Sequence, residues 1–368
     1  MSLEEAIARH SKHVQTTSYS MSVSELLSMY RDGELDLHPE FQRFFRWTDE
    51  QKSRLIESLI LGIPIPPIFV SEREDSKWDV IDGLQRLSTI LELMGELVDE
   101  EGRRKPPLML LQTHYLPDLE SRYWVHEEEN SSLPESVRIK IKRARLDINI
   151  VKSTSDTDVK YEVFQRLNKG GASATEQEIR NCLLVMSNRG YFNWIQHLSK
   201  SEAFKQTLSL TERAVEEAFD IELVCRLLIF SRKEVEELQR LDELGAYLNR
   251  EAVSQARDKN FPFELMEFTF NQTFSYLAEH LQENAFRRYS TQSGRYVGPL
   301  LVSIYEVVAV GLANRLQGGA SLPPSREFLD RHQKLWSELG QKKFVGSGVR
   351  ASTRVPETVR FGREWVQV

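Results

Sequence analysis

The junction between a short strand and a helix at residues 78–94 places the tightest constraint on how this chain folds. Residues 78–81 alternate between apolar and polar side chains, as in a half-buried strand. Further along, apolar residues recur at the spacing that lines one face of a helix, namely Leu87, Ile90, Leu91 and Met94. The segment Asp82-Gly83-Leu84-Gln85-Arg86 lies between them. The sequence therefore predicts a strand that is followed directly by a helix through a turn containing glycine.

Such a junction offers a place for an anion, because the first turn of a helix carries unpaired N–H groups and the positive end of the helix dipole. Gly83 permits close approach of the backbone, and Arg86 can donate a pair of charged hydrogen bonds to a phosphate oxygen. A purely structural interpretation is also open. Asp82 is a good N-cap, and Gln85 stands three residues later, where a capping box places its glutamine.

Two further motifs flank this junction. Residues 39–47 read PEFQRFFRW and precede a predicted helix that has Thr48 and Gln51 as a capping box and Gly62 as its end. The prolines that follow Gly62 exclude a helix and favour an extended run entering a strand. The third motif is VFQRLNKGG at residues 163–171.

Together, and in this order, the three motifs resemble the N-terminal domain family of GmrSD-type restriction endonucleases, over roughly residues 20–190. The resemblance implies a core similar to the ParB and sulfiredoxin fold. It also implies that Asp82, Gly83, Gln85 and Arg86 take the positions of a family signature, Asp-Gly-Gln-Gln-Arg, that is implicated in handling a nucleoside triphosphate. Leu84 stands where that signature has its first glutamine, so this chain is expected to bind nucleotide and to hydrolyse it slowly if that glutamine positions water or phosphate.

The composition of the 368 residues fits a globular protein with two domains, since 40% are hydrophobic and 28% are charged. We expect an α+β fold, in which a small mixed sheet is followed by an all-α helical bundle. The expected divisions are a flexible arm at 1–20, a nucleotide-binding domain at 21–188, a helical domain at 189–340 and a basic tail at 341–368. Cys182 and Cys225 are expected to be core residues, and the lack of a disulfide framework, signal peptide or membrane span favours the cytoplasm.

The net charge of −7 means that DNA contacts must come from local basic patches. One candidate patch follows Gly340 and contains Lys342, Lys343, Arg350, Arg354, Arg360 and Arg363. The other contains Arg138, Lys140, Lys142, Arg143 and Arg145. The alternatives are a solvated tail for the first cluster and an ordinary solvated face for the second.

The sequence lacks the residues that several classes of enzyme require. None of the eight histidines stands in a metal-binding or nuclease pattern, and there is no Walker-type phosphate loop. Sulfiredoxin chemistry needs a thiolate in the phosphate loop, and neither cysteine is near Asp82. The chain is thus not expected to cut DNA by itself, and a separate nuclease subunit is a possible partner.

Two functional hypotheses remain. In the first, the chain is an NTP-hydrolysing module in which Asp82, Gln85 and Arg86 are catalytic. Asp82 then holds Mg²⁺, because a carboxylate beside a phosphate is unfavourable without a cation between them. Arg43 approaches the same pocket, and Asn168 closes its far side with Gly170 and Gly171. In the second, the chain is a DNA-binding or sensing module that uses the same fold without turnover.

Overall fold

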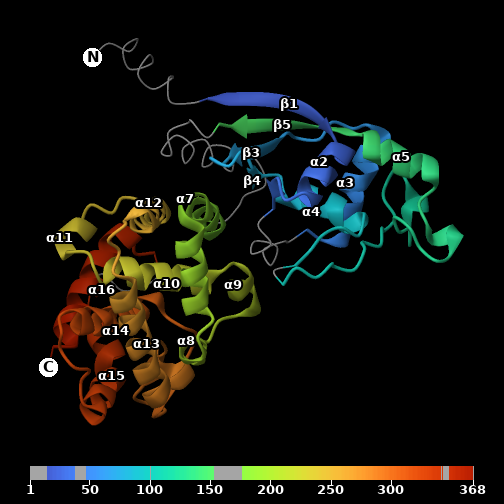
Figure 1. Cartoon of the computed structure of the whole chain (residues 1–368). Coiled ribbons are helices and arrows are strands. Elements are labelled where there is room, and N and C mark those ends of the chain that lie inside the picture. Colours follow the sequence, from blue (N-terminus) through green and yellow to red (C-terminus); the bar gives the residue numbers. More distant parts are fainter. Residues whose placement is uncertain are drawn as a thin grey trace. The chain divides into compact units, whose positions relative to one another are not determined.

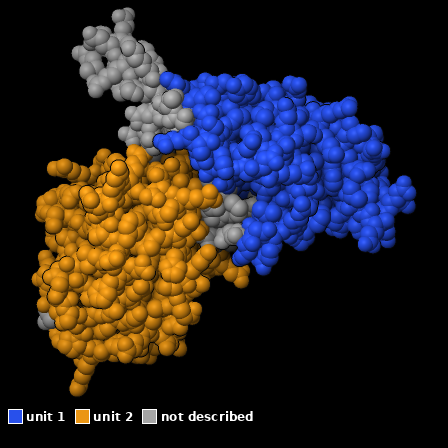
Figure 2. Space-filling view, viewed as in Figure 1, with its two compact units in different colours: residues 1–173 blue, residues 174–368 orange. Residues whose placement is uncertain are grey.

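The structure, a computed structural model, describes residues 15–37, 47–99, 101–152, 176–340, 342 and 348–367. The chain divides into two compact units, residues 1–173 and 174–368 (Figure 2). The expected boundary at 188/189 falls inside one helix, α7 (Glu176–Ser199), which bends at Asn188 while both of its halves belong to the second unit. Residues 1–14 of the predicted arm lie outside the described residues, but its end is already regular structure, because the first strand begins at Thr16.

The first unit is built on a mixed sheet (Figure 1). Its strands are β1 (Thr16–Ser22), β2 (Leu35–Asp36), β3 (Ile68–Glu72), β4 (Trp78–Asp82) and β5 (Arg145–Val151). They lie in the order β1-β5-β3-β4-β2. β3 pairs in parallel with β5 and antiparallel with β4, so the strand that carries the motif at its end lies beside the strand that follows the proline-rich segment.

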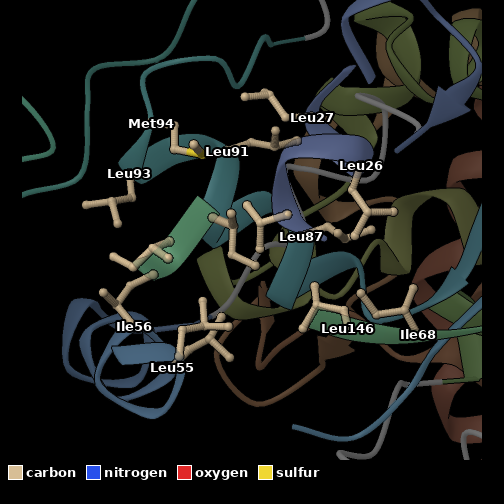
Figure 3. Packing of buried hydrophobic residues seen from close by; sticks show 14 of the residues in the cluster. Leu26, Leu27, Leu55, Ile56, Ile68, Leu87, Leu91, Leu93, Met94 and Leu146 are labelled. Atoms are coloured by element: carbon tan, nitrogen blue, oxygen red, sulfur yellow. The ribbon is translucent and has the colours of Figure 1, made fainter. Parts of the chain in front are cut away.

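Helices α2 (Val23–Arg31), α3 (Asp49–Leu61), α4 (Leu84–Leu93) and α5 (Glu135–Arg143) complete this unit. Their apolar faces share one core with alternate residues of β5, and Figure 3 shows Leu26, Leu55, Leu87 and Leu146 meeting in it. The predicted capping box of Thr48 and Gln51 is present, and Gly62 ends α3 in the left-handed conformation. Local signals therefore determine where this helix begins and ends.

The described residues between 97 and 133 are mostly loop, with two short 3₁₀ helices, η2 (Pro117–Leu119) and η3 (Glu129–Ser131), and isolated bridges. Glu57 of α3 anchors it, because its carboxylate accepts hydrogen bonds from the backbone N–H groups of Tyr115 and Leu116 at 2.8 and 3.1 Å.

The second unit is helical apart from one short hairpin. Besides α7 it contains α8 (Glu202–Thr207), α9 (Glu212–Glu216), α10 (Phe219–Phe230), α11 (Val235–Leu238), α12 (Leu244–Arg257), α13 (Phe263–His280), η4 (Gln282–Asn284), β6 (Arg288–Ser290), β7 (Arg295–Val297), α14 (Val302–Gln317), α15 (Ser325–Gly340) and α16 (Ala351–Trp365). The α+β class is thus confirmed. Cys225 is fully buried in α10, where burial raises the pKa of its thiol to about 11, and Cys182 is half-buried.

The expected basic tail is wrong for residues 351–365, because they form α16. Close contact with α14 holds this helix in place: a Cβ atom on Gly311 would lie 2.7 Å from the carbonyl oxygen of Gly362. Val355 and Val359, one turn apart on α16, are completely buried. The apolar stripe between the basic residues therefore packs α16 into the helical unit. In the described part of the chain, no helix combines the length and the apolar character needed to cross a membrane.

Candidate nucleotide site

The turn between β4 and α4 can be made only by glycine at position 83. Gly83 has a φ of +96°, and a Cβ atom there would lie 2.8 Å from Cγ1 of Ile68 on the neighbouring strand. Residues that carry a Cβ atom rarely adopt this backbone conformation, and the buried side chain of Ile68 leaves no space for a Cβ atom at position 83. The fold by itself therefore requires glycine at position 83, whether or not a ligand approaches the backbone there.

The predicted capping box of Asp82 and Gln85 is wrong. The N-cap of α4 is Gly83, and no side chain caps the helix. Because the chain turns through Gly83, the helix begins at Leu84, and Asp82 stands outside the N-cap position. The first turn of α4 therefore keeps its N–H groups free of any side-chain cap, as an anion site requires.

Arg86 occupies the second half of this turn and is already hydrogen bonded. Its Nη2 donates to Oδ2 of Asp82 at 2.6 Å, and its Nη1 donates to the carbonyl oxygens of Pro67, at 3.1 Å, and Pro66. The Arg86 side chain is 12% exposed and that of Asp82 is 37% exposed. The guanidinium is thus held in a fixed orientation at the surface, while part of the Asp82 carboxylate faces solvent.

The proline-rich segment before β3 supplies two of the three acceptors of Arg86. Pro66 and Pro67 precede β3 and have no N–H groups of their own to pair. Their carbonyl oxygens accept from Arg86, so the side chain ties the start of β3 to the first turn of α4.

Leu84, at the position where the family signature has glutamine, is half-buried and packs against the core of the first unit. Gln85 lies on the first turn of α4, and its backbone carbonyl accepts from Oγ1 of Thr89 at 2.7 Å. The sequence motif is therefore one compact group at the end of β4.

A magnesium ion at this place would have one protein ligand. Among the residues that the structure describes, there is no group of three His, Cys, Asp or Glu side chains that could hold a metal ion. One carboxylate is nevertheless a usual protein contribution to Mg²⁺ when the ion is also bound by nucleotide phosphates. Asp82 fits that donor set and does not fit an all-protein metal site.

The other predicted members of the pocket, Arg43, Asn168, Gly170 and Gly171, lie outside the described residues. Trp47, the last residue of the motif at 39–47 that contains Arg43, is partly buried against the core of the first unit. The structure thus brings together Asp82, Gly83, Gln85 and Arg86.

The predicted DNA contacts after Gly340 do not form one free basic surface. Arg354 is not available to DNA, because its guanidinium donates two hydrogen bonds, each of 3.1 Å, to the fully buried Glu306 of α14. Arg360 pairs with Glu357 at 2.8 Å, and Nζ of Lys342 lies over the ring of Phe361. Arg350 is exposed just before α16. Lys343 lies outside the described residues, so DNA binding here stays a prediction that rests on Lys342 and Arg350.

A groove between α3 and α5 was missed by the sequence analysis, which offered the second basic cluster as a candidate DNA patch or an ordinary solvated face. Lys140, Arg143 and Arg145 line this groove, whose volume is 620 Å³. The signal in the sequence is helical spacing, which places four residues of α5 on one face of the helix and therefore on one shared surface. These residues are Ser136, Ile139, Lys140 and Arg143.

Comparison with known proteins supports the resemblance found in the motifs. Residues 23–185 match the family described as "GmrSD restriction endonuclease, N-terminal domain". No curated protein and no solved structure matches the chain. The matched range includes the whole of the β4–α4 junction and all three motifs.

Proposed function

Because residues 23–185 match the N-terminal domain family of GmrSD restriction endonucleases, we propose that this chain is a component of a restriction or phage-defence system and that it binds and hydrolyses a nucleoside triphosphate there. The observation that carries the proposal is the group formed by Asp82, Gly83, Gln85 and Arg86 at the start of a helix without a side-chain cap. A glycine turn, free N–H groups and an arginine are the parts that a phosphate site needs.

The proposed mechanism starts from the resting ion pair. The phosphates of the nucleotide approach the first turn of α4, and Arg86 exchanges the carboxylate of Asp82 for a phosphate oxygen. Asp82 would hold Mg²⁺ together with the phosphate oxygens, and the ion would supply positive charge against the negative charge that develops during phosphoryl transfer. Gln85 orients the attacking water.

We further propose that a nuclease domain or subunit elsewhere performs any DNA cleavage. No histidine of the sequence has a second ligand at nuclease spacing. DNA would be held by local basic patches, of which Lys342 and Arg350 form one candidate.

The test is a panel of the four NTPs with Mg²⁺, in which binding is measured by calorimetry and turnover by phosphate release. Arg86→Ala is expected to abolish triphosphate binding while the chain remains folded, with at most a modest fall in melting temperature from the lost bonds to Asp82, Pro66 and Pro67. Arg103→Ala is a matched control, because Arg103 forms the same kind of i,i+4 pair with Asp99 on the surface of the same unit. Unchanged affinity in Arg86→Ala, or equal losses in both variants, would contradict the proposal.

The second candidate, a DNA-binding or sensing module without turnover, is favoured by one observation: Arg86 already bonds to Asp82, Pro66 and Pro67 within the fold. In that case Arg86 serves the fold. Salt-sensitive DNA binding that no NTP alters, together with a large loss of stability in Arg86→Ala, would support this candidate over the first.

A further inference from the structure

The groove between α3 and α5 lies wholly within the first unit and opens to solvent. It is lined by the last turn of α3, the loop that follows it, and one face of α5; these residues are Ser58, Leu59, Gly62, Ile63, Pro64, Ile65, Ser136, Ile139, Lys140, Arg143, Ala144 and Arg145. No acidic residue and no aromatic residue is among them. The groove therefore combines aliphatic and cationic surface.

The apolar part of the groove is exposed to water. Ile63 is 43% exposed and Ile139 is 40% exposed. Single exposed aliphatic residues are ordinary on protein surfaces. Here they come from two different elements and line one groove, together with Pro64 and the partly buried Ile65. Covering them with another apolar surface would remove this area from water and favour binding.

The cationic part comes from α5. Ser136, Ile139, Lys140 and Arg143 recur at helical spacing and share one face, whereas Ile141 points into the core and is fully buried. Lys140 and Arg143 form no ion pair with any described residue. Arg145 lies near Glu25, where the hydrogen bond from Ser22 is the main cause of the lowered pKa of that carboxyl and Arg145 contributes. The rim thus presents at least two positive charges that have no ion-pair partner among the described residues, in a chain whose net charge is −7.

We propose that this groove docks an acidic amphipathic helix from a partner protein. The aliphatic floor fits Leu or Ile anchors of such a helix, and the rim of Lys140 and Arg143 fits its Asp and Glu residues. Single-stranded nucleic acid fits less well, because the lining offers no aromatic ring on which a base could stack. The nine residues of α5 span about 14 Å, enough to contact about two to three turns of the incoming helix.

The test uses labelled full-length protein and one defined probe. The probe is a peptide of about 14 residues with Leu at helical spacing, i, i+3, i+4 and i+7, and Glu at most other positions, and binding is followed by the methyl NMR signals of Ile63, Ile65 and Ile139. A scrambled peptide of the same composition and a single-stranded oligonucleotide of similar charge are run beside it. We expect saturable shifts of the three methyl signals with the amphipathic peptide alone.

Two variants test whether the peptide binds in this groove. Arg143→Glu and Ile139→Asp are expected to weaken peptide binding about tenfold or more, because each removes part of the complementary surface. Lys142→Glu is the matched control: it makes the same change of charge on the same helix, but Lys142 lies beside Trp124 outside the groove, so less than a twofold change is expected.

Three outcomes would overturn the proposal: no saturable shifts with the amphipathic peptide, equal binding of the scrambled peptide, or shifts of the same methyl signals by the oligonucleotide at lower concentration. The last outcome would assign the groove to nucleic acid. Nucleotide binding at Arg86 is measured separately, so failure here leaves the proposed function untouched.

Discussion

Each unit of the molecule contains an arginine paired with a carboxylate, and the two arrangements differ in how they are built. In the first unit, Asp82 and Arg86 lie one helical turn apart, and Asp82 is 37% exposed. In the second unit, Glu306 of α14 is completely buried and accepts from Arg226 of α10, at 2.9 Å, and Arg354 of α16. The first pair joins neighbours in the sequence, and the second joins three helices.

This difference decides what each arrangement can do. The proposed function requires that a phosphate reach Arg86 from solvent and take the place of Asp82, whose side chain is 37% exposed. No ligand can reach Glu306 unless α10, α14 and α16 separate. Similar ionic groups can therefore support ligand exchange at one place and the assembly of a domain at the other, according to burial and to the distance along the chain between the partners.

The largest expected effect is that of Glu306→Gln. It leaves the guanidinium of Arg354 without its carboxylate partner and Arg226 with Glu222 alone, which is expected to lower the free energy of unfolding by about 3 kcal/mol, the lower end for a broken buried pair. Urea unfolding of the full chain measures this. Glu357→Gln is the control, because its pair with Arg360 is at the surface and contributes less than about 1 kcal/mol. Equal losses in the two variants would remove the distinction between buried and exposed pairs.

A second effect comes from another buried group of the same unit. Burial lowers the pKa of His332 to about 4, and its ring bonds to Tyr296 and to the carbonyl oxygen of Ala285. The unfolded chain takes up this proton near pH 6.5 and the folded chain only near pH 4, so stability is lost as pH falls from 6.5 towards 4. The loss at pH 5 is expected to be about 2 kcal/mol.

Urea titrations at pH 7 and pH 5 measure this loss. His332→Asn should be less stable at both pH values and should show a smaller difference between them, because no imidazole is left to titrate. A slope unchanged by the substitution would assign the pH dependence to other groups.

The third effect sharpens the role of Asp82. If Asp82 holds Mg²⁺ once Arg86 has moved to phosphate, Asp82→Asn should remove most of the Mg²⁺ dependence of nucleotide affinity, about a tenfold loss in the presence of the ion. Calorimetry with Mg²⁺ and with a chelator measures it, and Asp99→Asn is the matched control. If the substitution lowers nucleotide affinity equally with Mg²⁺ and with the chelator, Asp82 acts only by orienting Arg86.

The smallest expected effect is that of Leu84→Gln, which restores the glutamine of the family signature. Phosphate release should become severalfold faster at unchanged nucleotide affinity if that glutamine orients water. Because Leu84 is only half-buried, the stability should change by no more than about 1 kcal/mol. A slower variant, or one less stable by more than this, would show that Leu84 is required for packing.

Local signals made part of this fold predictable. The capping box of Thr48 and Gln51 and the end of α3 at Gly62 depend on a few adjacent residues, and both are as expected. The capping box of Asp82 and Gln85 is wrong because the contact between Gly83, which follows β4, and Ile68 of the neighbouring strand β3 sets the backbone of the turn. Residues 351–365 were taken for a tail because Glu306, the partner of Arg354, lies 48 residues away.

The hydrogen bonds that Arg86 makes before any ligand arrives impose a threshold on what can bind there. An anion gains from Arg86 only the difference between its own bonds and those with Asp82, Pro66 and Pro67 that it displaces. A monoanion replaces one carboxylate by another group of the same charge and gains little. A triphosphate brings more charge, and its accompanying cation gives Asp82 a new partner. Under the proposed function, the ion pair of Asp82 and Arg86 therefore acts as a filter that favours a triphosphate with its cation over small, singly charged ions.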